Sequence, residues 1–585
     1  MRKLAVWILA LGIAAAPAVF AADGPGKDKS SEDTKKAATD TAKTESTKAD
    51  ATKTDAVKKD ATTTPTNTEV VAEMEQLRAL LKAQADQLEE QRRELAEMKA
   101  ELSHGTTAAS ATAGEASGAT ASPTTMAAAS PMPAANPAAN PAAPPQDSSS
   151  PLQFRIGDAT ITPVGFMDFT TVWRSRVGGS GIGTNFAGVP YGSTTGALPF
   201  AANLSEFRFS MQNSRIGFRV DADIKGAHVM GYMEADFLGN NPGNVAVTSN
   251  SNTLRSRLYW VDVRKGQWEV LGGQTWSLIT PNRSGISPLP ADIFYSQNID
   301  VNYQAGITWG RIPEARFVYH PSDKFALAFA LEGAEQYTGG SAGAPQITCP
   351  GALGTICTAE FNNGGTTLAS TSRAPDIIVK AAWDPIKRFH IEAGGVESQF
   401  HDFNPTTAAK FNSTGGGAFL NLNGEVFKGM RLIVNTFWSD GGGRYIFGTV
   451  PDAIIRANGA ISPIHVGSTV DGFEYTHGNT LLYAYYGGIF ATRNLAFDTN
   501  GTTVIGYGVP GNPAQNRSIT EYTGGFAQTF AKSPKYGALI FMGQYSFVNR
   551  DPWGVVAGQP ENAHMNMFFL NLRYLLPGSA PTIGK

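Results

Sequence analysis

The chain has 585 residues, of which 47 are basic and 50 are acidic, so that its formal net charge at pH 7 is only −3. A balance so close to neutrality gives no reason to expect nucleic-acid binding, which needs a basic surface. After the N-terminus no run of about 18 apolar residues occurs, and this excludes a helix that crosses a bilayer.

The N-terminus has the pattern of a secretory signal peptide over residues 1–22. Met1-Arg2-Lys3 is basic, residues 4–16 are apolar, and small residues follow, which is the order that export signals show. The apolar run is too short to serve as a membrane anchor. We therefore expect the chain to be exported, with cleavage near Ala21 or Ala22.

Three segments follow before the main domain. Residues 23–68 are mostly Lys, Asp, Thr and Ala, so that they cannot bury a core and are expected to be disordered. Residues 69–103 repeat apolar side chains every seven positions from Met74 to Leu102, which predicts a short coiled coil; a single amphipathic helix lying on a surface is the alternative. Residues 104–150 are rich in Ala, Pro and Ser, and we interpret them as an extended linker.

From residue 151 to residue 585 the pattern becomes that of a transmembrane β-barrel. Segments of about ten residues alternate apolar and polar side chains, for example Lys324–Leu331 and Met567–Leu575. A strand can cross a bilayer only in a closed sheet, because hydrocarbon offers no partner for a free edge. The fold class is therefore predicted to be all-β, an antiparallel barrel in the outer membrane preceded by the short α-helical coiled coil.

Short turns and long loops alternate along this region. Short turns are expected at 225–227, 265–266, 321–323, 384–386, 428–429, 477–479 and 532–534. Long connections are expected at 176–203, 239–252, 278–302, 338–371, 401–416, 440–466, 491–514 and 550–563. This alternation predicts 16 strands, with 14 or 18 as alternatives, and places both ends on the side of the short turns. A change of phase near Gln212–Ser214 predicts a bulge.

Side chains that alternate with the apolar ones are expected to face the lumen. The cations assigned to the lumen in this way are Arg208, Arg215, Arg219, Arg255, Arg257, Arg316, Lys380 and Arg431. The same alternation places Tyr259 inside, and Leu258 and Trp260 outside. Arginine keeps its charge and binds carboxylate or phosphate oxygens, so that one interpretation is an anion-attracting constriction. The other is a balanced network in which Asp221, Glu234 and Asp236 pair with the arginines.

The connection 278–302 carries more apolar side chains than an external loop needs. It contains Ile286, Leu289 and Ile293 together with the cation Arg283. We expect it to fold into the lumen and to narrow it, with Arg283 as a further lining residue. Packing against neighbouring loops outside the pore is the alternative.

Three stretches resemble the DcaP-like outer-membrane porins. They are Asn213–Phe218, Leu254–Tyr259 and Gly272–Ser277, and that family also has a coiled coil before its barrel. The resemblance weakens from about residue 340. One departure from many outer-membrane barrels, which end on an aromatic residue, is that Pro577–Lys585 follows the last predicted strand.

The resemblance implies a homotrimer of sixteen-stranded barrels in the outer membrane, with the N-terminal region in the periplasm. It implies passive diffusion of small anionic solutes such as dicarboxylates, and no cofactor. Matched to the family's motif, Arg215, Arg255, Arg257, Gln274 and Trp276 are the expected pore-region residues. The coiled coil could also contact a periplasmic partner or the cell wall.

Other functions find less support in the sequence. The eight histidines are scattered, and Gly339–Gly343 matches a nucleophile elbow only in its letters, since it lies in a Gly-rich loop. We therefore expect no enzyme, although a barrel hydrolase with a site at its rim is an alternative. A tethering barrel and a phosphate- or sugar-selective porin are the others. Cys349 and Cys357 are expected to form a local disulfide and not a metal site.

Overall fold

The computed structural model describes Lys82 and most of the chain from residue 152 onward. The described ranges are 152–178, 181–191, 199–240, 251–293, 297–334, 347–353, 373–404 and 406–577. The predicted signal peptide, disordered segment, coiled coil and linker lie outside them, apart from Lys82, which is helical. Within these ranges no helix has both the length and the apolar character needed to cross a membrane.

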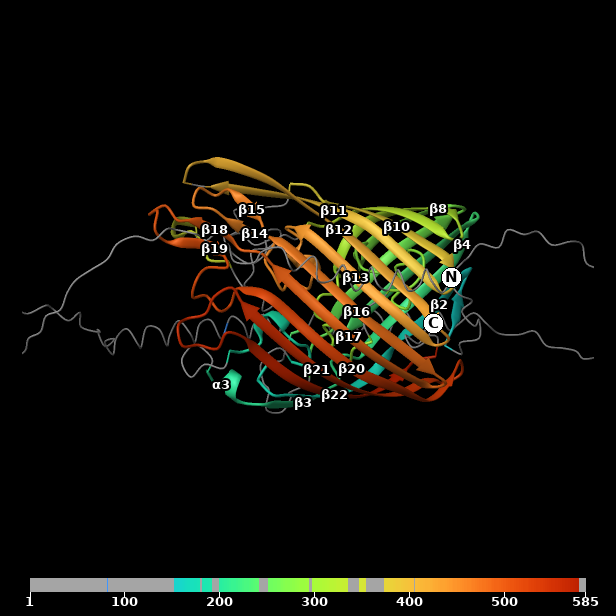
Figure 1. Ribbon diagram of the computed structural model, residues 1–585. Coiled ribbons are helices and arrows are strands. Elements are labelled where there is room, and N and C mark those ends of the chain that lie inside the picture. The colour runs from blue at the N-terminus through green and yellow to red at the C-terminus, as the bar shows by residue number, and fades with distance from the viewer. Residues whose placement is uncertain are drawn as a thin grey trace, which may run out of the picture. The chain divides into compact units, whose positions relative to one another are not determined.

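Sixteen antiparallel strands close into a barrel, as predicted, when β3 and β4 are counted as one strand interrupted by a bulge (Figure 1). They are β2 (Ala159–Arg174), β3 (Glu206–Ser210) joined to β4 (Arg215–Ile224), β5 (Ala227–Asp236), β6 (Arg255–Lys265), β7 (Trp268–Trp276), β8 (Arg311–Ser322), β9 (Phe325–Glu332), β10 (Asp376–Ile386), β11 (Phe389–Asn404), β12 (Ala409–Phe427), β13 (Met430–Asp440), β16 (His465–His477), β17 (Thr480–Ala491), β20 (Asn516–Ser533), β21 (Gly537–Pro552) and β22 (Ala563–Leu575). The last strand, β22, pairs with the first, β2, with Phe166 opposite Leu575, so that this part of the sheet has no free edge.

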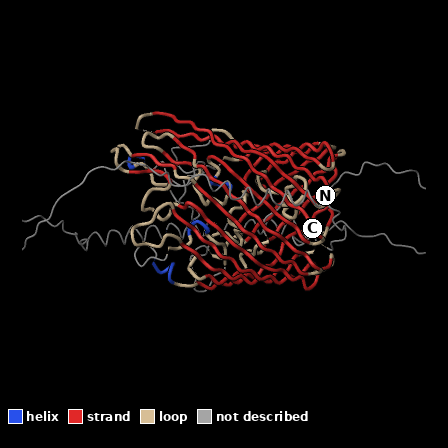
Figure 2. The backbone as a smooth tube through the Cα atoms, in the orientation of Figure 1, coloured by secondary structure: helices blue, strands red, loops and turns tan. Residues whose placement is uncertain are grey.

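The remaining elements are short. β1 (Phe154–Ile156) pairs with the start of β2. The long loops contain η1 (Phe186–Gly188), α3 (Pro199–Asn203), η2 (Gly351–Leu353), η3 (Gly443–Tyr445), β14 (Ala453–Ile455), β15 (Ile461–Pro463), β18 (Asn494–Phe497) and β19 (Val504–Tyr507). Both described ends of the chain lie at the short-turn end of the barrel, and the long loops gather at the other end (Figure 2).

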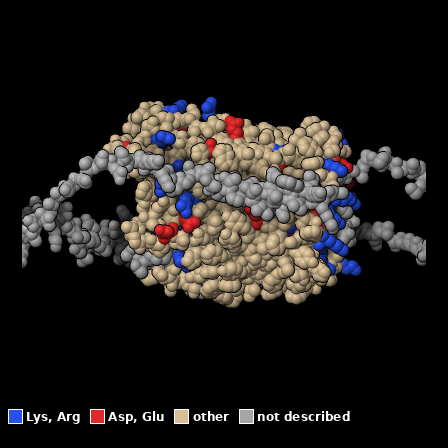
Figure 3. Space-filling model, in the orientation of Figure 1, with Lys and Arg blue, Asp and Glu red and all other residues tan. Residues whose placement is uncertain are grey.

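The strands form because their two faces differ in polarity. On β9 the alanines Ala326, Ala328 and Ala330 are buried inside, whereas Leu327 and Phe329 are exposed on the outer wall. The rings of Trp268 and Tyr319 contact each other with centroids 4.6 Å apart near the short turns, where an aromatic girdle is expected at the membrane interface. Lys and Arg side chains also gather at this end of the barrel (Figure 3).

The prediction of a long loop at 401–416 is wrong. β11 and β12 continue through it as one long hairpin, in which Phe400 pairs with Ser413 (Figure 1). Phe400 is buried against Ala453 and Ile461 of the neighbouring loop, so that loop packing stabilises these strand ends. Apart from Phe403, their outward side carries polar residues such as His401, Lys410 and Asn412, and this polarity is why the sequence predicts a loop here. The predicted turn at 384–386 is also displaced, because β10 continues to Ile386.

Two bulges set which side chains enter the lumen. The predicted break near Gln212–Ser214 is confirmed, because β3 ends at Ser210 and β4 starts at Arg215. A second bulge at Arg257 was missed: Glu234 pairs with Leu258, but the next residue on β5 pairs with Ser256. The alternation therefore reverses after Arg257.

The reversal corrects three sequence-based assignments. Leu258 and Trp260 are buried inside the barrel, and Trp260 stacks on Tyr232 at 5.4 Å. Tyr259 instead faces outward and is 51% exposed. Arg257 itself, as the extra residue of the bulge, still faces inward.

Candidate functional site

The connection from β7 to β8 lies inside the barrel, which confirms the prediction that it enters the lumen. We call residues 277–310 the inner loop, of which 277–293 and 297–310 are described. Wall carboxylates accept hydrogen bonds from its backbone N–H groups: Glu332 from Leu278 at 2.7 Å, Glu392 from Asn282 at 3.1 Å, Asp384 from Gly285 at 2.9 Å and Glu521 from Ala305 at 2.8 Å. These acceptors belong to β9, β11, β10 and β20, so the loop is hydrogen-bonded to widely separated parts of the wall.

Apolar side chains of the inner loop fill space within the barrel. Leu278, Ile279, Ile299 and Ile307 are almost fully buried. Burial of these groups supplies the hydrophobic stabilisation that a loop in water would lack. It also explains why the sequence of this loop is so rich in large aliphatic residues.

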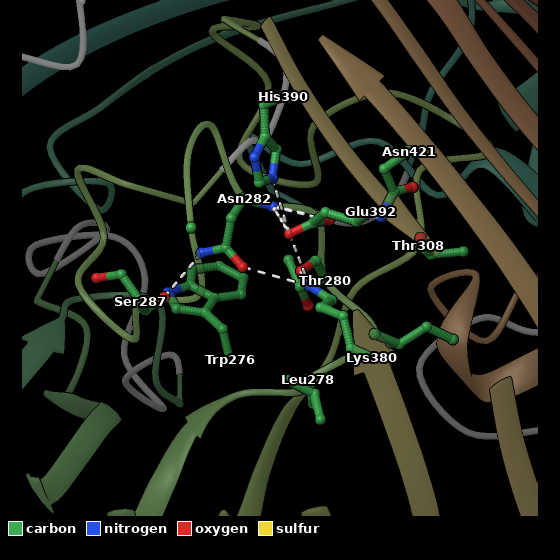
Figure 4. Close-up of polar contacts among 12 residues, drawn as sticks. Trp276, Leu278, Thr280, Asn282, Ser287, Thr308, Lys380, His390, Glu392 and Asn421 are labelled. Atoms are coloured by element: carbon green, nitrogen blue, oxygen red, sulfur yellow. Dashed lines mark hydrogen bonds and ion pairs between the residues drawn. The ribbon is translucent and has the colours of Figure 1, made fainter. Parts of the chain in front are cut away.

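Lys380 and Glu392 fasten the first half of the inner loop. Lys380 Nζ donates to the carbonyl of Thr280 at 2.8 Å, to Asn282 Oδ1 at 3.3 Å and to Glu392 Oε1 at 3.1 Å (Figure 4). His390 Nε2 lies 3.2 Å from the same Glu392 oxygen. Lys380 was predicted as a lumen cation, and the structure places it in a buried network beneath the loop.

Three of the predicted pore arginines meet two carboxylates on neighbouring strands. Arg257 Nε donates to Glu234 Oε1 at 2.8 Å and its Nη1 to Asp236 Oδ2 at 2.6 Å. Arg255 binds Asp236 through two hydrogen bonds of 2.8 and 3.1 Å. Arg215 Nη1 lies 3.4 Å from Glu234 Oε1. Of the three side chains only that of Arg255 is substantially exposed, at 40%.

Arg311 adds a fourth guanidinium to this group, which sequence reasoning missed. It stands 5.9 Å from the ring of Trp276, and Arg257 stands 6.0 Å from the same ring. Its Nη1 atom is buried and has no hydrogen-bond partner among the described residues. Arg311 begins β8 in the same alternation as the exposed Pro313, so the sequence pattern alone would have placed it outside.

We call Arg215, Arg255, Arg257 and Arg311 the arginine group. Among the described residues, Arg215, Arg255 and Arg257 bind two carboxylates, Glu234 and Asp236, and Arg311 forms no ion pair, so that four positive charges face two negative ones. A surplus of positive charge within low-dielectric walls attracts anions. The constriction interpretation therefore survives at this position.

Elsewhere the balanced-network interpretation describes the predicted cations better. Arg208 binds Glu206 at 2.8 Å, Arg219 binds Asp221 at 2.7 Å, Arg283 binds Glu474 at 3.0 Å, Arg316 binds Glu314 at 2.5 Å, and Arg431 donates to Asn423. Arg208 alone among these five is more than a third exposed, at 42%. The others are held against the wall or, in the case of Arg283, tie the inner loop to β16.

Gln274 and Trp276 lie on opposite sides of the barrel wall. Gln274 pairs in register with the outward-facing Tyr259, and its Nε2 donates to the Arg257 carbonyl at 2.8 Å. It therefore holds the bulge from the outer side and does not face the lumen. Trp276 lies inside, buried against Tyr303 and Trp309, with ring centroids 6.1 and 5.8 Å apart.

Asp300 links the inner loop to the loop that follows β2. Its Oδ1 accepts hydrogen bonds from the backbone N–H groups of Thr184 at 3.2 Å and Asn302 at 2.8 Å. Burial raises the pKa of Asp300, although the charge of Arg174 opposes this shift. The contact between the two loops therefore contains an acid that is held in a poorly solvated position.

The described residues contain no cluster of three or more His, Cys, Asp or Glu side chains that could hold a metal ion. Cys349 Sγ lies 3.8 Å from the carbonyl of Ile347. Its predicted disulfide partner, Cys357, is outside the described residues, so that this pairing stays a prediction.

Comparisons with known proteins give a structural likeness. No protein-family model matches the sequence, and no curated protein does. The outer-membrane channel DcaP of Acinetobacter baumannii is 16% identical, with a TM-score of 0.52, over 72% of this chain and 99% of that one. The anion-selective porin from Comamonas acidovorans is 12% identical, with a TM-score of 0.39, over 72% and 100% of the two chains. The chain thus has the sixteen-stranded porin-type fold of an outer-membrane channel.

Proposed function

We propose that this protein is an outer-membrane porin that lets small anionic solutes, such as dicarboxylates, diffuse past the arginine group beside the inner loop. The observation that carries the proposal is the surplus of two positive charges in that group, with Arg255 open to solvent. A guanidinium fork matches the geometry of carboxylate oxygens. Exposed Arg208 supplies a second accessible cation on the inner wall.

The fold supports passive transport. An apolar outer wall and a polar inner wall are the two faces of an outer-membrane channel, and the inner loop narrows the interior. The similar solved structure is described as a channel, which agrees with the expectation that the chain is not an enzyme. The proposal includes a homotrimer, an N-terminal region in the periplasm and no cofactor.

Ion selectivity in planar bilayers tests the proposal. The full chain should give steady currents, and in a salt gradient the reversal potential should show a preference for anions. Arg255→Gln should weaken that preference, because Asp236 keeps Arg257 as its partner and the barrel remains folded. Arg388→Gln is the matched control, since Arg388 lies in the short turn between β10 and β11. An unchanged reversal potential in Arg255→Gln would contradict the proposal.

A second candidate is a closed barrel that tethers the membrane to the cell wall or to a periplasmic partner. The dense packing of the inner loop favours it, because Leu278, Ile279 and Ile307 fill the interior with apolar side chains. Purified protein that inserts without open-channel current would support this candidate. Liposome swelling with dicarboxylates, phosphates and sugars would separate the anion channel from phosphate- or sugar-selective porins.

A further inference from the structure

Lysines occupy the short turns around much of the barrel. An exposed lysine lies in each of the turns β4–β5, β6–β7, β8–β9, β10–β11, β12–β13 and β20–β21, whereas the turn from β16 to β17 has His477 instead. We call these side chains the rim lysines: Lys225, Lys265, Lys324, Lys387, Lys428 and Lys532. Figure 3 shows the Lys and Arg side chains gathered at this end of the barrel.

The rim lysines have no carboxylate partners among the described residues. The acids nearest to two of them bind other groups. Asp384 lies 2.9 Å from His390 Nδ1, and Glu425 lies 3.5 Å from Arg388 Nε. The exposed carboxylates described at this end are only Asp158, Asp223 and Asp323. The rim therefore carries a surplus of positive charge that the protein itself does not neutralise.

Large apolar side chains stand directly beside three of the rim lysines. These neighbours are Trp268 opposite Lys265 in the β6–β7 register, Ile386 before Lys387, and Phe427 before Lys428. The three apolar side chains are 63%, 62% and 74% exposed, respectively. A side chain that is this apolar and this exposed, next to an amine, suits the boundary between acyl chains and lipid headgroups.

The outer wall places the rim lysines at the level of the headgroups. Outward aromatic side chains mark the membrane interface of a barrel. At the short-turn end Trp268 contacts Tyr319, and Trp383 and Tyr475 are also exposed on the outer wall. The rim lysines lie in the turns just beyond these rings. Their amines are therefore within reach of phosphates at the membrane surface.

We infer that the rim lysines bind the phosphates of anionic phospholipids in the leaflet on the short-turn side, which is the periplasmic leaflet of an outer membrane. An ammonium group binds phosphate as a point charge, without the fixed geometry that a guanidinium needs. Amines spread around a rim favour lipids with a net negative charge, such as phosphatidylglycerol. Phosphatidylethanolamine has no net charge, because its own ammonium balances its phosphate. The inference does not depend on transport.

Lipid retention by the full chain tests the inference. Native mass spectrometry after incubation with equal amounts of phosphatidylglycerol and phosphatidylethanolamine should show several-fold more of the anionic lipid bound. Replacing Lys265, Lys387 and Lys428 with glutamine should abolish most of this preference. Arginine at the same three positions should preserve it, because the charge remains.

Lys410→Gln is the control for position, since Lys410 is an exposed lysine near the tip of the β11–β12 hairpin at the opposite end of the barrel. It should leave the preference unchanged. Equal retention of the two lipids by the wild type would overturn the inference. So would an unchanged preference in the triple glutamine variant, or an equal loss in Lys410→Gln.

Two further measurements separate the lipid from other anions. Added salt should weaken retention through screening, but inorganic phosphate at equal ionic strength should displace no more lipid than chloride does, because it lacks the acyl chains that contact the apolar neighbours. Specific displacement by phosphate would mean that the rim binds free phosphate, and the lipid inference would be wrong. Bilayer currents are recorded on the same samples. A glutamine variant with altered ion preference and wild-type lipid retention would assign the lysines to the channel mouth instead, whereas absent current with intact lipid preference would contradict only the channel proposal.

Discussion

Lys380 Nζ and Glu392 Oε1 are 3.1 Å apart, and neither side chain is exposed at all. The pair connects β10 and β11 and also holds the inner loop, since Lys380 binds the Thr280 carbonyl and Glu392 accepts from the Asn282 N–H. Two buried charges are stable only with good geometry and further hydrogen bonds, and both conditions are met here. One contact thus couples the barrel wall to the element that narrows its interior.

Removing the lysine should destabilise the barrel. Lys380→Met leaves the buried Glu392 without its lysine partner and with His390 Nε2 at 3.2 Å as its remaining basic neighbour, and breaking one side of a buried pair costs about 3–5 kcal/mol. Denaturant unfolding of the refolded barrel would measure the loss. The double variant Lys380→Met with Glu392→Met removes both charges and should recover part of it. Equal stability of the single variant and the wild type would show that the pair contributes little.

The channel should lose its preference for anions when the three arginines of the arginine group that pair with carboxylates are replaced. Neutral residues at Arg215, Arg255 and Arg257 leave Arg311 alone against Glu234 and Asp236, which is a formal surplus of one negative charge. The reversal potential in a salt gradient should then shift from anion toward cation preference, and the shift should shrink at high salt because of screening. Arg219→Gln, which breaks a pair outside the group, is the control.

The sequence was sufficient for the barrel, because the two-residue period and the spacing of turns follow directly from a wall with lipid on one side and polar groups on the other. It failed where the period is interrupted. The bulge at Arg257 reverses the alternation, and no residue type at this position indicates a bulge. The sequence pattern therefore assigned Tyr259 to the inner face and Trp260 to the outer face, which is the reverse of their positions in the structure. The strand ends around Phe400 were missed because tertiary packing stabilises them.

The arginines show a second limit of sequence reasoning. Alternation identifies which guanidiniums face inward, but it does not tell which of them are neutralised. Arg219 and Arg316 each bind an acid two residues away on their own strand, and this same-face spacing could have been read from the sequence. The position of Arg311 depends on how the inner loop re-enters β8, which is a tertiary property.

Asp300 should make the contact between the two loops depend on pH. Burial raises the pKa of Asp300, so that the folded state binds its proton more tightly than the unfolded state does. The contact is therefore most stable at a pH below the ordinary aspartate value of about 4. It should weaken as the pH rises from there through the raised pKa.

Hydrogen–deuterium exchange of peptides covering 181–191 and 297–310 would measure this, after correction for the intrinsic rate at each pH. Protection should fall with rising pH in the wild type. Asp300→Asn keeps an acceptor for the Thr184 and Asn302 N–H groups and should remove the dependence. The same slope in both proteins would mean that another group controls the contact.

Gly306 should be required for the inner loop to lie against the wall. Its φ is +91°, and a Cβ there would come within 2.5 Å of the Thr469 carbonyl oxygen and 2.7 Å of that of Gly488. Gly306→Ala therefore combines left-handed strain of about 1–2 kcal/mol with a backbone clash that forces the loop away from β16 and β17. We expect single-channel conductance to rise or to fluctuate more, and thermal stability to fall. Gly266→Ala is the control, because its φ is +60° but nothing lies within 4 Å of the added carbon. That variant should lose only the stability due to strain and keep the wild-type conductance, whereas matching conductance in the Gly306 variant would show that the loop does not set the width of the path.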